Sequence, residues 1–142
     1  MKFVLVPGGW QGGWVFDALA ADLRQAGHEV EAVTLSGLEQ DTPADFASAP
    51  NLDTHINQVA DLIATSDDAR LVLCGHSYAG LVIAGVAASG GPWPGTPFGP
   101  LTDRLRNDPA WTFHEIPVGH NIARRDPHAL AAVLAALPPS VS

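Results

Sequence analysis

Hydrophobic positions follow two spacings that alternate along the chain. Short continuous apolar runs at 3–6 and 71–74 are typical of strands that are buried on both faces. Between these runs, apolar residues recur every three or four positions, which places them on one face of a helix. This alternation predicts an α/β fold: a three-layer sandwich in which helices cover both faces of a mostly parallel sheet. The predicted strands are 3–6, 29–33, 70–75 and 111–116, and the predicted helices are 14–26, one that carries 56–63, 78–88 and one that carries 130–137.

Residues at the predicted helix ends support these boundaries. Gly27 is expected to stop the first helix, and Asp53 or Thr54 can cap the second. Asp126 followed by Pro127 is typical of a helix start, because proline is favoured at the first helical position. Two irregular segments are also predicted, a polar loop at 34–51 and a segment rich in proline and glycine at 89–110.

The composition excludes several classes of protein. The chain has 142 residues, of which 15% are charged, and a net charge of −8. These values favour a single globular domain over residues 1–142, and the lack of a basic stripe argues against a nucleic-acid or membrane partner. The lone Cys74 excludes an internal disulfide and a cysteine-based zinc site. No apolar run approaches the roughly 18 residues of a membrane helix, and the first residues lack an export pattern, so we expect a cytoplasmic protein.

The junction between the predicted strand 70–75 and the helix after it carries the clearest chemical signal. Gly75, Ser77 and Gly80 form a Gly-x-Ser-x-x-Gly pattern, with Ala79 at the position where the common Gly-x-Ser-x-Gly pattern has its second glycine. A sharp strand-to-helix turn strains the serine backbone and requires small neighbours. The helix that follows directs its positive end at the place where an oxyanion would form. The pattern therefore predicts that Ser77 is a nucleophile.

Three further segments add to this pattern. They are residues 4–14, which read Val-Leu-Val-Pro-Gly-Gly-Trp-Gln-Gly-Gly-Trp, the stretch 52–56, and the stretch 115–120, which ends in Gly-His. Together with the turn at Ser77 they resemble the α/β-hydrolases, in particular the branch of small esterases and hydroxynitrile lyases. In that family the loop after the first strand and the residue after the nucleophile supply the backbone N–H groups of an oxyanion hole. The resemblance implies a nucleophile at Ser77, a general base at His120, and N–H donors at Gly9 and Tyr78.

The chain departs from the family pattern between Ser77 and His120. Family members carry a lid and further strands in this interval, and the acid of the catalytic triad normally lies there, whereas here the interval is short. Its acidic residues between 88 and 111 are Asp103 and Asp108, and neither directly follows a predicted strand. Asp126 is better explained as a helix cap. The resemblance thus implies a reduced α/β-hydrolase fold with about four strands in the order 2-1-3-4, and the triad acid stays open.

Other residues with functional chemistry have simpler structural interpretations. His76 is expected to pack or to form a hydrogen bond, and His114 to be structural within its strand. Trp10, beside the oxyanion loop, is the candidate for a substrate pocket, and Trp14 is expected in the core. No pair of histidines has the helical spacing of a metal site, and surface or helix-end positions are expected for His28, His55 and His128.

These observations predict a serine hydrolase that acts on a small ester or thioester through an acyl-serine intermediate, without a metal or another cofactor. The alternative is a catalytically impaired relict that serves as a binding or assembly module, because no segment is recognisable as the carrier of the triad acid. The expected partners are a small-molecule acyl substrate and a second copy of the chain. A sheet with few strands leaves apolar edges uncovered, so we expect a homodimer.

Overall fold

Three parallel strands form the centre of the computed structural model, which describes residues 1–40, 49–66, 70–87, 107, 109, 112, 114 and 116–137. The strands are β1 (Lys2–Val6), β2 (Glu29–Ala32) and β3 (Leu71–Gly75), and their order in the sheet is β2-β1-β3. Both pairings of the central strand β1 are parallel. The predicted order 2-1-3 is therefore confirmed for these strands.

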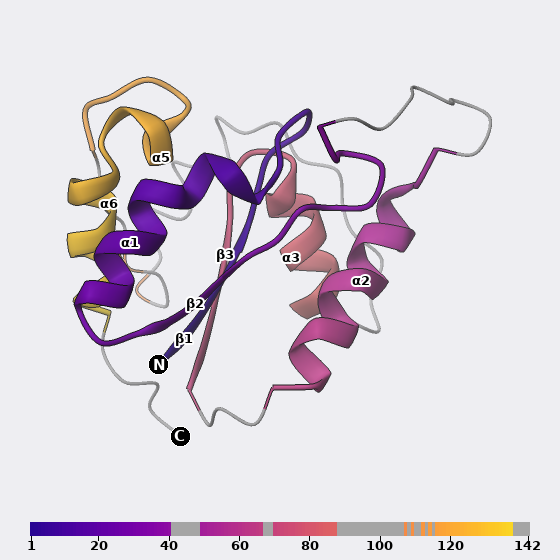
Figure 1. Ribbon diagram of the computed structural model, residues 1–142, viewed down its shortest axis with the longest axis horizontal. Helices are drawn as coiled ribbons and strands as arrows, with labels where there is room; N and C mark the ends of the chain where they lie inside the picture. Colours follow the sequence, from indigo (N-terminus) through magenta and orange to yellow (C-terminus); the bar gives the residue numbers. More distant parts are fainter. Residues whose placement is uncertain are drawn as a thin grey trace.

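Helices cover both faces of this sheet (Figure 1). On one face lie α1 (Asp17–Gln25), α5 (Ile122–Arg125) and α6 (Pro127–Ala135), and on the other lie α2 (Leu52–Ala64) and α3 (Ala79–Ala87). The three-layer α/β arrangement expected from the strand–helix alternation is thus confirmed. Within the described part of the chain, no helix is long and apolar enough to cross a membrane.

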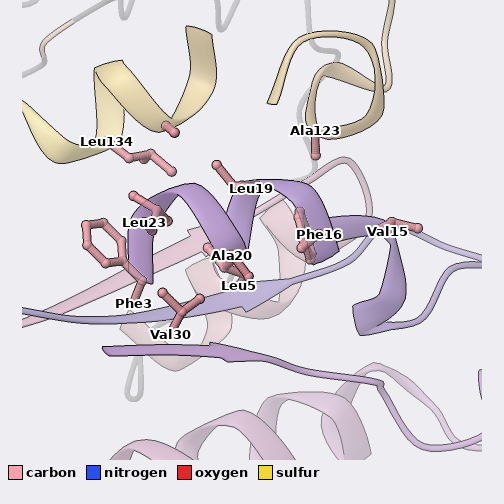
Figure 2. Packing of buried hydrophobic residues seen from close by; sticks show 11 residues of the cluster. Phe3, Leu5, Val15, Phe16, Leu19, Ala20, Leu23, Val30, Ala123 and Leu134 are labelled. Carbon is pink, nitrogen blue, oxygen red and sulfur yellow. The ribbon is translucent and has the colours of Figure 1, made fainter. Parts of the chain in front are cut away.

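Two hydrophobic cores follow from the alternation of side chains along β1. Phe3 and Leu5 are fully buried on the face covered by α1, and Val4 and Val6 are fully buried on the other. Figure 2 shows α1 between the sheet and α6, with Leu134 of α6 on its far side. Burying one such side chain contributes roughly 1.5–3 kcal/mol, so β1 holds both layers together.

The helix ends depend on single polar groups. The side chain of Asp126 accepts the backbone N–H of Ala129 at 3.0 Å, with Pro127 at the first helical position, as the sequence predicts. The capping residue of α2 differs from the one expected, which was Asp53 or Thr54. Asn51 is the cap, with an extended backbone and a side chain that accepts the N–H of Thr54 at 2.9 Å, because Leu52 already packs against the core beneath α2.

The first predicted helix, 14–26, divides into two parts. It opens with a 3₁₀ turn, η1 (Gly13–Phe16), in which the N–H of Val15 donates to the carbonyl of Gly12 at 3.2 Å, and α1 follows. Gly27 ends it with a φ of 84°, a backbone conformation that favours glycine.

Two sequence predictions fall largely outside the described residues. Of the fourth strand expected at 111–116, residues 111, 113 and 115 lie outside them, and the described residues 112, 114 and 116 are not assigned to a strand. Most of the irregular segment expected at 89–110 also lies outside the described part. Both expectations stay predictions.

Candidate functional site

The carboxyl ends of β1 and β3 lie side by side, so the loops that follow them meet. Val6 and Gly75 are partners in the parallel register. The pairing continues one residue beyond β3, where the N–H of His76 donates to the carbonyl of Val6 at 3.1 Å. Ligands of open α/β sheets bind outside the carboxyl ends of neighbouring strands, which is where the sequence places its candidate site.

Ser77 occupies a strained turn between β3 and α3. Its φ is 56°, and in the described part of the chain it shares a left-handed backbone only with Trp10 among non-glycine residues. The turn is closed by the N–H of Ala79, which donates to the carbonyl of His76 at 3.1 Å. A Cβ on Gly75 would lie 2.9 Å from the carbonyl oxygen of Ala79, so the turn requires glycine there. Such backbone strain costs about 1–3 kcal/mol and clusters at functional sites.

The glycine-rich loop between β1 and η1, residues 7–12, packs directly against this turn. A Cβ on Gly8 would lie 3.0 Å from Nδ1 of His76 and 3.2 Å from Cβ of Ser77, and a Cβ on Gly9 would lie 3.9 Å from Cβ of Tyr78. Gly9 and Tyr78, predicted from the sequence as N–H donors, are thus neighbours. Among the described residues, neither backbone N–H donates a hydrogen bond.

His120 is brought to the same end of the sheet by His76. Nε2 of His76 lies 2.7 Å from the backbone oxygen of His120. Because a carbonyl oxygen only accepts, His76 donates this bond through a protonated Nε2. The two imidazole rings are 4.8 Å apart between centroids. This is the hydrogen-bonding role expected for His76. The side chain of His120 is exposed, and within the described part of the chain no hydrogen bond joins it to the hydroxyl of Ser77.

A buried histidine behind the turn was missed by the sequence prediction. His55 was expected at a surface or helix-end position. It does lie in the first turn of α2, but it is not on the surface, because only 5% of it is exposed. Its Nδ1 lies 2.9 Å from the hydroxyl of Tyr78, and its Nε2 lies 2.9 Å from the backbone oxygen of Ser36. Burial raises the pKa of Tyr78 above its ordinary value. One indication of this burial was present in the sequence. His55 precedes Val59 by four positions, which puts both residues on one helix face, and Val59 is fully buried.

Trp10 of the glycine-rich loop and Trp14 of η1 are both on the surface. Trp14 was expected in the core, but it is 41% exposed, because the turn of η1 directs Val15 and Phe16 inward instead. The guanidinium of Arg124 lies 5.8 Å from the centroid of its ring, within the range of a cation–π contact. Trp10 is 89% exposed, so its role in a substrate pocket stays a prediction.

No metal site is formed by the described residues, since none of their His, Cys, Asp and Glu side chains gather in groups of three. Asp103 and Asp108, the candidates for the triad acid, lie outside the described residues. The remaining histidines have other surroundings. His28 stacks edge-on against Phe3, His128 pairs with Asp22 at 2.6 Å, and His114 is exposed.

An open polar cleft of about 680 Å³ runs along the start of α2 and contains none of the predicted site residues. Its lining combines acidic and amide side chains, including Glu39, Asp53, Asn57 and Asp61. The chemistry predicted from the sequence therefore centres on the loops after β1 and β3 rather than on this cleft.

Known proteins resemble this chain in sequence. Residues 3–141 match the sequence profile of the alpha/beta hydrolase family. Carbendazim hydrolyzing esterase of Nocardioides sp. (strain SG-4G) is 44% identical over 86 residues, which are 61% of this chain and 35% of that esterase. Methylesterase 1 of Arabidopsis thaliana is 32% identical over 83 residues, which are 58% of this chain and 32% of that enzyme.

A solved structure shows the same likeness. An extracellular alpha/beta-hydrolase from a Paenibacillus species, described as sharing structural and functional homology with Tobacco Salicylic Acid Binding Protein 2, superposes with a TM-score of 0.52. It is 30% identical, and the match covers 63% of this chain and 35% of that one. The chain spans about a third of the length of the curated relatives that it matches.

Proposed function

Because the chain belongs to the alpha/beta hydrolase family, we propose that it hydrolyses a small ester or thioester through an acyl intermediate on Ser77. The observation that carries this proposal is the left-handed backbone of Ser77, with a φ of 56°, at the tip of β3. The glycine-rich loop lies against it so closely that a Cβ on Gly8 would come within 3.2 Å of the Cβ of Ser77. Strain of this kind persists only where the surrounding structure enforces it.

In the first half of the proposed reaction, the oxygen of Ser77 attacks the carbonyl carbon of the ester. His120 takes the proton of the hydroxyl as general base. The carbonyl oxygen becomes an oxyanion, which accepts hydrogen bonds from the N–H groups of Gly9 and Tyr78. Removing one such donor from a comparable enzyme raises the barrier by about 2.7–4 kcal/mol. The intermediate then collapses, the bond from the carbonyl carbon to the leaving oxygen or sulfur breaks, and the leaving group takes the proton from His120 and departs as an alcohol or thiol.

In the second half, water attacks the acyl-serine. His120 accepts a proton from the water, the same two N–H groups hold the second oxyanion, and the bond between the acyl carbon and the oxygen of Ser77 breaks. The proton returns to Ser77, and the carboxylic acid leaves. The proposed reaction consumes the ester and one water molecule and releases a carboxylic acid and an alcohol or thiol, with no oxidant, metal or cofactor.

The names of the relatives support an ester as the substrate class. Two of them are a carbendazim hydrolyzing esterase and a methylesterase. Their match covers about three-fifths of this chain.

A fluorophosphonate probe tests the proposal directly, because it reacts with an activated serine and stays bonded to it. We expect labelling of the intact chain at Ser77, identified by mass spectrometry of the digested protein, and no labelling of Ser77→Ala. Activity toward p-nitrophenyl acetate should fall with the same variant. Modification of another serine with Ser77 untouched would contradict the assignment.

A second candidate function is a non-catalytic binding or assembly module. The observation that favours it is the position of His120, whose ring is exposed and forms no hydrogen bond with Ser77 among the described residues. Apo enzymes often show long catalytic contacts that shorten only with substrate, so hydrolysis remains the first candidate. Absence of fluorophosphonate labelling in a folded chain would favour the module.

A further inference from the structure

A chain of hydrogen bonds runs from the turn after β3 to the loop after β2. It passes from the hydroxyl of Tyr78 through the imidazole of His55 to the backbone oxygen of Ser36, with both distances at 2.9 Å. His55 is 5% exposed and lies in α2, beside α3 (Figure 1). A polar group at such depth is retained only when it is satisfied by hydrogen bonds, and here both ring nitrogens are.

The partners of His55 determine its tautomer. The carbonyl of Ser36 can only accept, so Nε2 carries the proton and donates to it. Nδ1 then holds a lone pair, and the hydroxyl of Tyr78 donates to it. The ring of Tyr78 is also fixed edge-on against the imidazole, with 5.7 Å between centroids and 84° between planes. The Tyr78 side chain is therefore held at its ring and at its hydroxyl.

We propose that His55 is a positioning residue, which orients the backbone N–H of Tyr78 toward the oxyanion by holding the Tyr78 side chain. The inference rests on the proposed function, in which that N–H stabilises the transition state. Tyr78 directly follows Ser77, and its N–H donates to no described residue. A side chain fixed at its far end restricts the rotation of its own peptide unit. Such restriction matters because an oxyanion donor works by being oriented before the charge develops.

Gln58 offers a matched control on the same helix. Its Nε2 donates to the carbonyl of Thr34 at 3.0 Å, and its Oε1 accepts the N–H of Ser36 at 2.9 Å. Gln58 thus ties α2 to the same loop as His55 does, with bonds of similar length, but it forms no hydrogen bond with Tyr78 among the described residues. Removing Gln58 weakens this tie without releasing Tyr78.

Steady-state kinetics with p-nitrophenyl acetate separate positioning from stability. We expect His55→Leu and Tyr78→Phe each to lower kcat by about 10- to 100-fold, with KM changed by less than about 3-fold, because only the transition state carries the oxyanion. The double variant should be no slower than the slower single one, since both break the same chain. His55→Asn, whose amide oxygen can replace Nδ1, should recover part of kcat.

Gln58→Leu should keep kcat within about 3-fold of the parent, although it removes two hydrogen bonds. Equal losses of kcat in Gln58→Leu and His55→Leu, or a kcat for Tyr78→Phe equal to that of the parent, would overturn the proposal. Tyr78→Phe keeps the buried ring and the backbone N–H, so it serves as the second variant if His55→Leu does not fold.

A measurement without turnover distinguishes this proposal from the proposed function. In nitrogen-15 NMR of the labelled chain, His55 should show one protonated and one unprotonated ring nitrogen, and Tyr78→Phe should shift the unprotonated one. The same substitution should lower the NMR order parameter of the N–H bond of residue 78, because a released side chain lets this peptide unit move, whereas Gln58→Leu should leave it unchanged. A protonated Nδ1, or an amide unaffected by Tyr78→Phe, would overturn the positioning role even if Ser77 reacts. Failure of fluorophosphonate labelling with these NMR results intact would overturn the proposed function alone.

Discussion

Gly8 lies against Ser77 with no space between them for a side chain. A Cβ on Gly8 would approach Cβ of Ser77 at 3.2 Å and Nδ1 of His76 at 3.0 Å. The loop after β1 therefore touches the turn after β3 through bare backbone. This contact places Gly9 next to Tyr78, since a Cβ on Gly9 would lie 3.9 Å from Cβ of Tyr78, and in the proposed mechanism both residues donate their N–H groups to the oxyanion.

Gly8→Ala should separate the loop from the turn. The added methyl group has to displace His76, Ser77 or the loop, so we expect a stability loss of about 1–3 kcal/mol, typical of overpacking, and about a 10-fold or greater loss of esterase activity. Chemical denaturation and p-nitrophenyl acetate hydrolysis measure the two effects. Gly80→Ala is the control, because its Cβ would meet nothing within 4 Å and alanine is favoured in a helix. Equal behaviour of the two variants would contradict the close contact.

His76→Phe should loosen the segment around His120. The variant keeps an aromatic ring but removes the donor to the backbone oxygen of His120, which lies 2.7 Å away. One such bond contributes about 0.5–1.5 kcal/mol, so hydrogen exchange at residues 118–121 should speed up by roughly 2- to 10-fold. His114→Phe, at an exposed position, is the control. Unchanged exchange in His76→Phe would show that His120 is held by other contacts.

Cys74 should make the folded chain less stable in alkali. Burial raises the pKa of its thiol from 9.0 to about 11. As the pH rises through this range, the unfolded chain loses the thiol proton while the folded chain keeps it, so unfolding becomes easier. The stability present below pH 9 falls by about 2–3 kcal/mol as the pH passes 11.

Urea denaturation of the parent and of Cys74→Ala, at about pH 8 and about pH 11, isolates this effect. Lys2 and Tyr78, whose pKa values are also raised, are present in both proteins, so their contribution cancels in the difference. The alanine variant should start less stable, because it loses the packing of the Cys74 side chain against the core, but should lose less stability with rising pH. Parallel losses in the two proteins would contradict the assignment to Cys74.

Asp103→Asn and Asp108→Asn should each change the esterase rate by less than about 10-fold. Loss of a true triad acid lowers turnover about 10⁴-fold, but neither aspartate directly follows a predicted strand. The measurement is the rate of Ser77 acylation by p-nitrophenyl acetate in each variant. A loss of several hundred-fold in one folded variant would identify it as the acid and refute this prediction.

The chain should form a homodimer or a larger assembly. Among the described strands, β2 and β3 each pair on one side only, and an unpaired strand edge is a site of association. Trp10, Trp14 and Val118 also expose large apolar side chains. Light scattering at micromolar concentration should give at least twice the chain mass of 14.8 kDa. A single species at the chain mass would refute the prediction.

The sequence by itself determined the parts of this protein that depend on neighbouring residues. Apolar runs identified β1 and β3, because a strand with helices on both faces needs apolar side chains at every position. The burial expected on both faces holds for β1, whereas β3, at the edge of the described sheet, is half-buried. Gly27 and the pair Asp126–Pro127 marked helix ends, since each residue type suits one backbone conformation. The turn at Ser77 was recognisable for the same reason, as its small neighbours Gly75 and Ala79 are a local steric requirement.

Only the tertiary structure decided which polar and aromatic residues are buried. His55 has an ordinary position on an amphipathic helix, and its burial arises because α2 packs beside α3 and the loop after β2 closes over it with the carbonyl of Ser36. Trp14 lies outside the core because η1 turns Val15 inward. Local spacing says which face a residue occupies, whereas burial depends on what other segments place opposite that face. That is why the strained turn at Ser77 was found from the sequence and the histidine behind it was not.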